Sequence, residues 1–467
     1  MEYSLNFDAT NYTVKTETVD QQTITYRAFE NIVYVKNPVD LMYHTMNIYV
    51  PEAYYEGKAV GRLTLKTAPI FMPNGVGGYM PGSSEVPGVH RRHKTMNATF
   101  FALTKGYVVT APALRGRGLK NEHGMFIGVA PACIVDYKAA VRYLRYNQKT
   151  IPGDVHKIIS NGTSAGGALS ALLGATGNST DYDSYLQEIG AAEEQDDIFA
   201  ASCYCPITNL EHADMAYEWM FHGINDFHTM DFSMEDGVPK LTPIDGVMTQ
   251  DQVKLSALLK PLFPDYLNGL KLKDSKGEEL SLTISGEGSF KNYVKSFVIN
   301  SAQTAVEKGV DLSELTWLTL KDQMVVDLDF NQYIQFATRM KATPAFDSIF
   351  MNTPENELFG TSTTQYQHFT EFGWSHSAMK GAKAAQEVIK LMNPMNYIGN
   401  RDSSVAKYYR IRHGAIDRDT SLAIPVIIAT KLMNEGSSVD FALPWGTQHD
   451  GDYDLVELFE WIEKITE

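Results

Sequence analysis

The sequence is poor in cysteine and in positive charge, and it contains no long apolar run. Three cysteines in 467 residues, Cys133, Cys203 and Cys205, cannot form a disulfide framework and are typical of a reducing compartment. Lys and Arg number 40 against 56 Asp and Glu, and the formal net charge of −16 argues against a nucleic-acid partner. No apolar run reaches the length of about 18 residues that a transmembrane helix needs, so we expect no membrane partner.

Two further features of the sequence concern location and metals. The first residues, MEYSLNFDATNYTVK, lack the basic and apolar segments of a secretory signal, so we expect a cytoplasmic location. Cys203 and Cys205 form a C-x-C pair in the apolar run AASCYCPI. Such a pair alone is weak evidence for a metal, and free cysteines are commonly buried. We therefore expect structural thiols here and no metal site.

Short apolar segments alternate with turns and helical patterns along much of the chain. Apolar residues recur at helical spacing over 136–148, and a run of small residues predicts another helix over 165–175. The expected strands are KTAPIFMP, KGYVVTAP, HKIIS and DIFAASCYC. Strand, turn and helix in alternation predict an α/β fold with a mostly parallel sheet flanked by helices.

This alternation stops near Pro206 and resumes near Pro394. The later segments YYRIRHG and SSVDFALPW read as strands, whereas SLAIPVIIATKLMNEG and DYDLVELFEWIEKI read as helices. We therefore expect a core formed by residues 1–205 and 396–467, interrupted between late strands by a cap, or lid, domain over 206–395. The core that remains has an ordinary size for one α/β domain.

One stretch, ISNGTSAGG, predicts a nucleophilic serine. Gly162-Thr163-Ser164-Ala165-Gly166 matches G-x-S-x-G and lies between a predicted strand and a predicted helix. In a nucleophile elbow the serine occupies a sharp turn, and glycines two residues before and after it avoid the neighbouring strand and helix. The turn places the hydroxyl at a helix N-terminus, whose dipole favours developing negative charge. We expect Ser164 to be the nucleophile.

A serine needs a base, and on this type of sheet the acid and histidine follow it in that order. Asp417 lies in the turn after the strand YYRIR, and His449 lies in the loop after VDFALPW. Loops at the same ends of parallel strands meet, so Ser164, Asp417 and His449 form the expected triad. Other nearby acids are Asp402, Asp419 and Asp450, and Asp417 ranks first because its H-G-x-x-D turn directly follows the strand. We expect His413 to be a packing or hydrogen-bonding residue.

An oxyanion hole should accompany the triad. One donor is expected to be the backbone N–H of Ala165, the residue after the nucleophile. The second is expected from the glycine turn that follows the strand KTAPIFMP, where either Gly77 or Gly78 can supply it. Glycines there allow backbone N–H groups to approach a substrate closely.

Several longer motifs are found together with the elbow and the glycine turn. They are NGVGGYMPG, NGTSAGG, PITNLEHADMAYEW, RMKATPAFD, TPENELFG, YRIRHGAIDRDTS and DFALPW. With these motifs, from about residue 70 to the C-terminus, the sequence resembles the bacterial tannases, tannin acyl hydrolases of the α/β-hydrolase superfamily. The combination with RMKATPAFD and RIRHGAIDRD is the specific part of the resemblance.

The resemblance implies hydrolysis of galloyl ester and depside bonds, with release of gallate and with no metal or organic cofactor. It places Lys341, Glu355 and Asp419 on the galloyl hydroxyls. The ring faces need apolar walls, and Pro354 and Ile207, which lie beside the matched motifs, are expected to supply them. Two carboxylates and one ammonium suit three adjacent phenols chemically. The expected partner is a small-molecule galloyl ester, and no obligatory protein partner is implied. The acyl pocket would form between cap and core.

Three other functions are compatible with parts of the pattern. A feruloyl or general aryl carboxylesterase would use the same triad without needing Lys341, Glu355 and Asp419 together. A serine peptidase is disfavoured because nothing resembles a propeller or a site for a peptide terminus. A catalytically silent binding protein on the same fold is disfavoured by the intact Ser164, Asp417 and His449.

Overall fold

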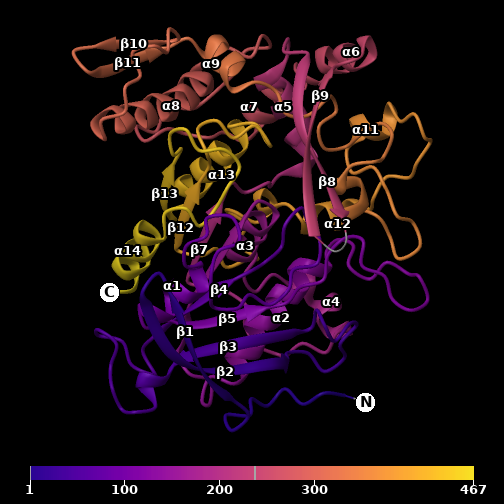
Figure 1. Cartoon of the computed structure of the whole chain (residues 1–467). Helices are drawn as coiled ribbons and strands as arrows, with labels where there is room; N and C mark the ends of the chain where they lie inside the picture. The colour runs from indigo at the N-terminus through magenta and orange to yellow at the C-terminus, as the bar shows by residue number, and fades with distance from the viewer. Residues whose placement is uncertain (1, 236–237) are drawn as a thin grey trace.

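The computed structural model describes residues 2–235 and 238–467, and it is built around one large sheet (Figure 1). Within the described residues nine strands form this sheet, in the order β1-β2-β3-β5-β4-β6-β7-β12-β13. The strands from β5 to β13 run parallel to one another, which confirms the predicted α/β class with a mostly parallel sheet. Their bounds are Val108–Pro112 (β5), Pro69–Pro73 (β4), Asp154–Thr163 (β6), Ala200–Tyr204 (β7), Tyr408–Arg412 (β12) and Ser438–Ala442 (β13).

The N-terminal strands were not expected from the sequence. They are β1 (Thr13–Val19), β2 (Gln22–Val33) and β3 (Thr45–Pro51), and they pair antiparallel with one another and with β5. Their side chains are only partly apolar, and β1 carries exposed Thr residues and half-buried Lys and Glu residues, so β1 lacks the continuous apolar run of a central strand. A tight reversal at Asp20 and Gln21, both with positive φ, joins β1 to β2.

Helices cover both faces of the sheet, and each face has its own apolar core. Alternating strand residues divide between the cores: Ile158 faces one and Ile159 faces the other. The larger core includes α2, α3 and α13, and the smaller one lies beneath α1 and α14. The helix bounds are Ala98–Thr104 (α1), Ala132–Tyr146 (α2), Ala165–Ala175 (α3), Asp183–Glu188 (α4), Ala423–Asn434 (α13) and Leu455–Thr466 (α14).

Between β7 and β12 the chain leaves the sheet and forms a separate layer beyond its end (Figure 1). The predicted cap domain over 206–395 falls within this excursion, and its exact boundaries stay a prediction. The helices here are α5 (Leu210–Phe221), α6 (Gln250–Leu259), α7 (Leu262–Gly269), α8 (Ser289–Glu307), α9 (Phe330–Ala337), α10 (Pro354–Leu358), α11 (Glu371–Ser375) and α12 (Gln386–Leu391). Two hairpins accompany them, β8 (Asp226–Glu235) with β9 (Val238–Val247) and β10 (Leu318–Lys321) with β11 (Met324–Leu328).

The excursion contains buried apolar side chains that pack on one another and are continuous with the core of the sheet. Phe263, Phe290 and Phe330 surround Trp219 of α5, with ring centroids between 5.3 and 5.9 Å from the indole. The same apolar cluster continues into the larger core of the sheet. Among the described residues, no helix is both long and apolar enough to cross a membrane.

Candidate active site

Ser164 lies on the sharp turn between β6 and α3 that the sequence predicts. Its backbone has φ 62° and ψ −121°, a conformation that side-chain-bearing residues rarely adopt. Holding one residue there costs about 1–3 kcal/mol, and such strain persists only where the surroundings enforce it. The N–H of Ser164 donates to the carbonyl of Tyr204 at the end of β7, at 2.9 Å. This hydrogen bond anchors the turn to the neighbouring strand.

The glycine two residues before Ser164 is required by close packing. A Cβ added to Gly162 would lie 2.3 Å from the carbonyl oxygen of Gly166, well inside any allowed contact. The strand and the first turn of the helix therefore approach each other too closely for a side chain. This contact explains the G-x-S-x-G spacing in steric terms.

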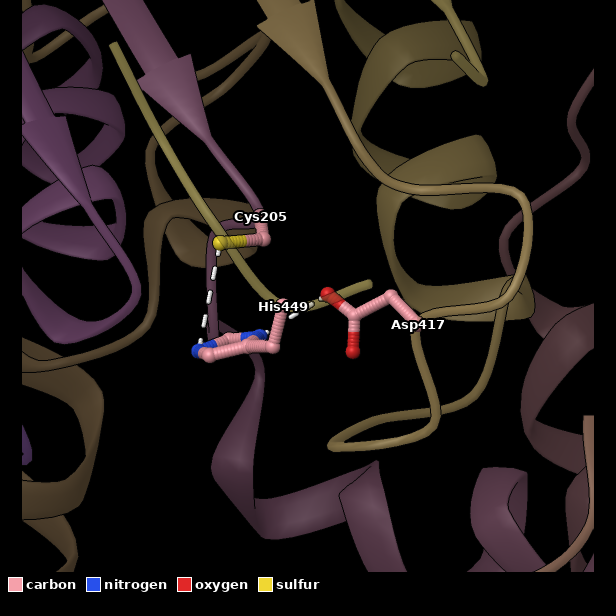
Figure 2. Close-up of side chains that lie close together, drawn as sticks. All are labelled: Cys205, Asp417 and His449. Atoms are coloured by element: carbon pink, nitrogen blue, oxygen red, sulfur yellow. Dashed lines mark hydrogen bonds and ion pairs between the residues drawn. The ribbon is translucent and has the colours of Figure 1, made fainter. Parts of the chain in front are cut away.

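The structure brings Ser164, His449 and Asp417 into one hydrogen-bonded line. The Ser164 Oγ lies 2.8 Å from Nε2 of His449, and Nδ1 of His449 lies 2.8 Å from Oδ2 of Asp417. Asp417 follows β12 and His449 follows β13, so the two loops leave the same end of parallel strands (Figure 2). Because the carboxylate accepts from Nδ1–H, Nε2 is free to accept the serine proton.

The charges of this line are set by its surroundings. Burial alone would raise the pKa of Asp417, but the imidazoles of His449 and His413 and the N–H of Asp419 hold it well below its usual range. For His449 burial has the opposite sign, and alone it would lower the pKa of the imidazole. The carboxylates of Asp417 and Asp419 outweigh burial and raise the pKa of His449 well above 6.5. Asp417 is therefore an anion that stabilises the imidazolium.

The competing residues occupy other positions. Asp402 is exposed on a turn, and Asp450 points toward Arg92 and His93 on the surface side of its loop. His413 is fully buried with its Nδ1 3.7 Å from Oδ2 of Asp417, so it lies beside the triad as well as in the core. Burial lowers the pKa of His413.

The two predicted sides of an oxyanion hole lie next to each other. Ala165 is the first residue of α3, where backbone N–H groups have no partner within the helix. The glycine turn after β4 packs on this helix end: Asn74 donates from Nδ2 to the carbonyl of Gly166 at 3.1 Å. Gly78 has φ 52°, and the carbonyl of Gly77 accepts from Met80. The choice between the N–H groups of Gly77 and Gly78 stays open.

Lys341, Asp419 and Glu355 form one charged cluster beside the triad. The Nζ of Lys341 is paired with Asp419, and Oδ2 of Asp419 lies 3.8 Å from Nε2 of His449. Asp419 and Glu355 raise the pKa of Lys341 against the effect of burial. Burial raises the pKa of Glu355, and Lys341 opposes this shift. Two acids and one ammonium thus form a cluster of mixed charge.

Backbone contacts hold this cluster in place. The hydroxyl of Tyr217 accepts from the N–H groups of Met340 and Lys341 and donates to the carbonyl of Arg418 at 3.0 Å. One phenol on α5 therefore fixes the Lys341 segment against the Asp419 loop.

The two apolar residues expected beside the ring differ in exposure. Ile207 is buried and donates from its N–H to the carbonyl of Ser164 at 3.3 Å, so it lies directly against the elbow. Pro354 is exposed and is the first residue of α10, one residue before Glu355.

Sequence reasoning missed Arg117, which joins the glycine turn to the excursion. Its Nε donates to the carbonyl of Gly78 at 2.6 Å, and its Nη1 donates to Glu357 of α10 at 2.5 Å. Arg117 lies in the stretch ALRGRG, which follows β5 and has the small residues and glycines of an ordinary turn. Nothing in that local pattern indicates a partner 240 residues away.

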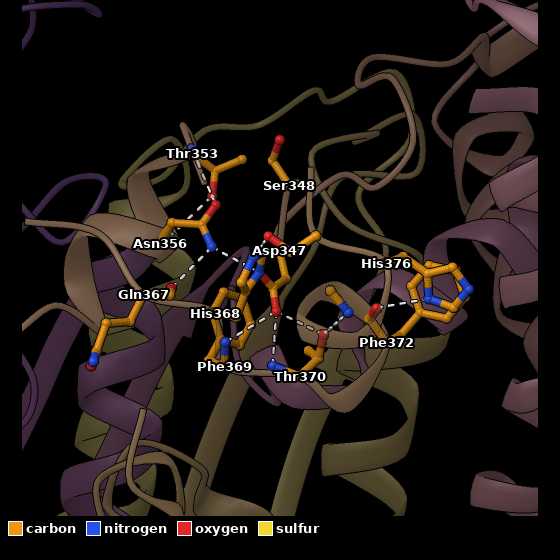
Figure 3. Close-up of polar contacts among 12 residues, drawn as sticks. Asp347, Ser348, Thr353, Asn356, Gln367, His368, Phe369, Thr370, Phe372 and His376 are labelled. Atoms are coloured by element: carbon orange, nitrogen blue, oxygen red, sulfur yellow. Dashed lines mark hydrogen bonds and ion pairs between the residues drawn. The ribbon is translucent and has the colours of Figure 1, made fainter. Parts of the chain in front are cut away.

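Asp347 was also missed, although it organises the segments that carry the cluster (Figure 3). This fully buried carboxylate accepts from Asn356 Nδ2 at 2.7 Å, His368 Nδ1 at 2.7 Å, and the N–H groups of Phe369 and Thr370 at 3.0 and 2.8 Å. Asn356 is the neighbour of Glu355 on α10. Asp347 therefore ties α10 to the chain at 367–370.

A second Asp–His–Ser line arises here, because Nε2 of His368 lies 2.8 Å from Oγ of Ser377. Ser377 does not sit on an elbow, and its Oγ also accepts from the N–H of Met379 at 3.2 Å. We interpret this line as structural.

Replacing Asp347 by Asn should loosen α10 and the 367–370 segment. The amide cannot accept from all of these donors, and leaving buried donors unpaired costs about 2 kcal/mol. We expect about 30-fold faster amide hydrogen exchange in peptides covering 354–370, measured by mass spectrometry. Asp251→Asn, an exposed site on α6, is the matched control and should leave this exchange unchanged. Unchanged exchange in Asp347→Asn would contradict the assigned role.

Several known proteins are similar to this chain in sequence and in structure. The BD-FAE family model matches residues 78–231, a range that contains Ser164. A tannase from Fusobacterium nucleatum is 49% identical, with 100% of each chain covered and a TM-score of 0.96. A tannase from Lactobacillus plantarum is 46% identical, with 99% of this chain and 100% of that chain covered and a TM-score of 0.96.

A tannin acyl hydrolase solved in complex with ethyl gallate is 46% identical, covers 99% of each chain and has a TM-score of 0.93. None of the curated proteins compared with this sequence matches it. Identity of 46–49% over essentially complete chains, on a common fold, shows that this chain belongs to the bacterial tannases of the α/β-hydrolase superfamily.

Proposed function

We propose that this chain is a serine esterase that hydrolyses galloyl ester and depside bonds of hydrolysable tannins and simple gallate esters. Gallic acid is released through an acyl-enzyme on Ser164, and no cofactor takes part. The observation that carries the proposal is the contact between two sets of groups. Asp419 belongs to the Lys341 cluster, yet its Oδ2 is 3.8 Å from Nε2 of His449, the base of the triad.

Acylation begins with a proton transfer along the triad. His449 Nε2 takes the proton of Ser164 as Oγ attacks the ester carbonyl carbon and forms a tetrahedral intermediate. Its oxyanion accepts hydrogen bonds from the N–H of Ala165 and from the N–H of Gly77 or Gly78. The intermediate collapses as its C–O bond to the alcohol breaks. The proton on His449 passes to the leaving oxygen, so a neutral alcohol departs.

Deacylation repeats these steps with water in place of Ser164. His449 takes a proton from water as the oxygen attacks the acyl carbon. Collapse of the second tetrahedral intermediate breaks the bond to Ser164 Oγ, which regains its proton from His449. Gallic acid leaves, and the free enzyme is restored. Asp417 stays ionised throughout and stabilises the imidazolium in both half-reactions.

Recognition of the acyl group follows from the donors and acceptors of the cluster. A galloyl ring presents three adjacent hydroxyl groups. Lys341 can donate to one oxygen, whereas Glu355 and Asp419 can accept from two O–H groups. A buried polar site of this kind rejects a ring that lacks the hydroxyls, because its own groups then lose their partners. Ile207 and Pro354 provide apolar contacts to the ring.

The principal alternative is a feruloyl or general aryl carboxylesterase that uses the same triad. A feruloyl ring carries one hydroxyl and one methoxyl group, so it would leave part of the cluster of Lys341, Glu355 and Asp419 unpaired. The relative solved with ethyl gallate supports the galloyl reading over this alternative.

Methyl gallate and methyl ferulate distinguish the two esterase functions. We expect kcat/KM for methyl gallate to exceed that for methyl ferulate by at least about 100-fold, because two or more hydrogen bonds to charged groups are lost with ferulate. Equal or faster hydrolysis of ferulate would contradict the proposal. Ser164→Ala is the control and should lose both activities, together with stoichiometric labelling by a fluorophosphonate.

Substitutions in the cluster separate recognition from bond cleavage. Lys341→Met and Glu355→Gln should each lower kcat/KM for methyl gallate about 10- to 100-fold, which corresponds to one hydrogen bond to a charged group. Hydrolysis of phenyl acetate, which has no ring hydroxyls to recognise, should change little. If both esters lose activity equally, these side chains support the triad or the fold instead.

The raised pKa of His449 predicts the acid limb of the pH profile. His449 acts as a base only when neutral, so kcat/KM for phenyl acetate should rise with pH through a midpoint above 6.5. Asp419→Asn removes a negative charge that favours the imidazolium, so its midpoint should move to lower pH. Asp402→Asn, at an exposed site, should leave the midpoint unchanged. A midpoint that does not move in Asp419→Asn would contradict this electrostatic role.

A further inference from the structure

Cys205 lies next to the base of the triad, and the proposed reaction does not use it. It directly follows β7, and its Sγ is 3.9 Å from Nε2 of His449 and 3.3 Å from the carbonyl oxygen of Asp450. Figure 2 shows the sulfur and the imidazole facing each other, with Asp417 on the other side of the ring. The Oγ of Ser164 is 2.8 Å from the same Nε2. The sulfur of Cys205 and the oxygen of Ser164 therefore both lie near Nε2 of His449.

The spacing of these atoms suits a metal ion. The ligand atoms of Cys205, His449 and Asp417 all lie within 4.8 Å of one another. In a tetrahedral site with bonds of about 2.3 Å to sulfur and 2.0 Å to nitrogen, the two ligand atoms are about 3.5 Å apart. The observed 3.9 Å between Sγ and Nε2 is only a few tenths of an ångström longer. A small movement of either side chain brings both atoms to bonding distance.

Asp417 and Asp419 give this pair a suitable environment. A histidine that binds a metal usually donates its other N–H to a carboxylate, which orients the ring and makes it a better ligand. Nδ1 of His449 already does this with Asp417 at 2.8 Å. Asp419 adds negative charge 3.8 Å from Nε2, and it is itself paired with Lys341. The triad geometry is thus also that of a supported metal-binding histidine.

We propose that a thiophilic divalent cation of the Zn²⁺ and Cd²⁺ class binds between His449 Nε2 and Cys205 Sγ, and that it reversibly inhibits the enzyme. The oxygen of Ser164 or a water molecule completes the coordination. Loss of hydrolysis as a consequence rests on the proposed function, whereas binding itself does not. Thiolate and imidazole ligands select such ions over Mg²⁺ and Ca²⁺, which prefer oxygen.

Binding involves exchange of protons and ligands without redox chemistry. The thiol of Cys205 releases its proton to solvent as the sulfur–metal bond forms, and His449 binds through the neutral Nε2 lone pair. The metal–nitrogen bond replaces the hydrogen bond from the Ser164 hydroxyl. The base can then no longer take the serine proton, so acylation stops. A chelator that removes the ion restores the base.

The position of Cys205 distinguishes it from the other two cysteines. Successive residues of a strand face opposite sides of the sheet, but Cys205 lies just past the end of β7, where the loops of the triad meet. All three cysteines are buried: Cys133 and Cys203 lie in the larger apolar core, whereas Cys205 borders the smaller one at the loops of the triad. The imidazole of His449 is 24% exposed, so the proposed ion would meet this ring first and then the buried sulfur behind it. The C-x-C spacing itself therefore has no role in binding.

Cadmium titration in chelator-free buffer tests both parts of the proposal. Micromolar CdCl₂ or ZnCl₂ should inhibit hydrolysis of methyl gallate by the wild-type enzyme, and EDTA should restore it, whereas MgCl₂ should have no effect. Cys205→Ala and Cys205→Ser should need at least about 100-fold more Cd²⁺ for half-inhibition, relative to their own uninhibited rates. Cys203→Ala is the matched control and should keep the wild-type sensitivity.

Direct binding to the Ser164→Ala variant keeps the test independent of activity. One equivalent of Cd²⁺ should bind by calorimetry and should produce the ultraviolet absorption of a cadmium–thiolate bond. This absorption should disappear in Ser164→Ala/Cys205→Ala. Binding without thiolate absorption, or equal inhibition of wild type and both Cys205 variants, would overturn the proposal. If the wild type does not hydrolyse methyl gallate, the proposed function fails, and the absorption still decides whether the metal site exists.

Discussion

The parallel alignment of four strands determines where the chemistry of this protein takes place. β6, β7, β12 and β13 end at one edge of the sheet, and each is followed by a residue of the site: Ser164, Cys205, the Asp417 turn and the His449 loop, respectively. Hydrogen bonds between neighbouring strands fix the register of these loops, as the contact from Ser164 N–H to the Tyr204 carbonyl illustrates. The strained turn at Ser164 is therefore maintained by the sheet as a whole.

The charged cluster of Lys341, Glu355 and Asp419 is also held by contacts between different segments of the chain. Lys341 comes from the excursion between β7 and β12, and Asp419 comes from the loop after β12, yet one phenol on α5 contacts the backbone of both segments. Buried carboxylates extend this support outward: Asp347 organises α10 and the segment that follows it. The charged cluster and the triad are thus parts of one hydrogen-bonded system.

The sequence was sufficient for features with a local signature. The spacing of Gly162, Ser164 and Gly166 reflects a steric contact within a few residues, so a short motif reveals it. The proximity of Asp417 and His449 to Ser164 could be predicted because the loops after neighbouring parallel strands meet at the same end of the sheet. Lys341 and Glu355 depended on a family resemblance, since a lysine and a glutamate have no local pattern of their own. Arg117 and Asp347 could not be predicted because their hydrogen-bond partners lie in other segments of the chain. The N-terminal strands could not be predicted because their faces are partly polar.

The contacts of Arg117 limit how the acid specificity of such enzymes can change. One guanidinium binds the carbonyl of Gly78 and the carboxylate of Glu357, so the backbone expected to stabilise the oxyanion is physically linked to the helix that carries Glu355. Replacing α10 by a helix that lacks this glutamate would break the link and leave the glycine turn without its tie to the helix. Recombination between relatives should succeed only when the arginine and its glutamate are inherited together.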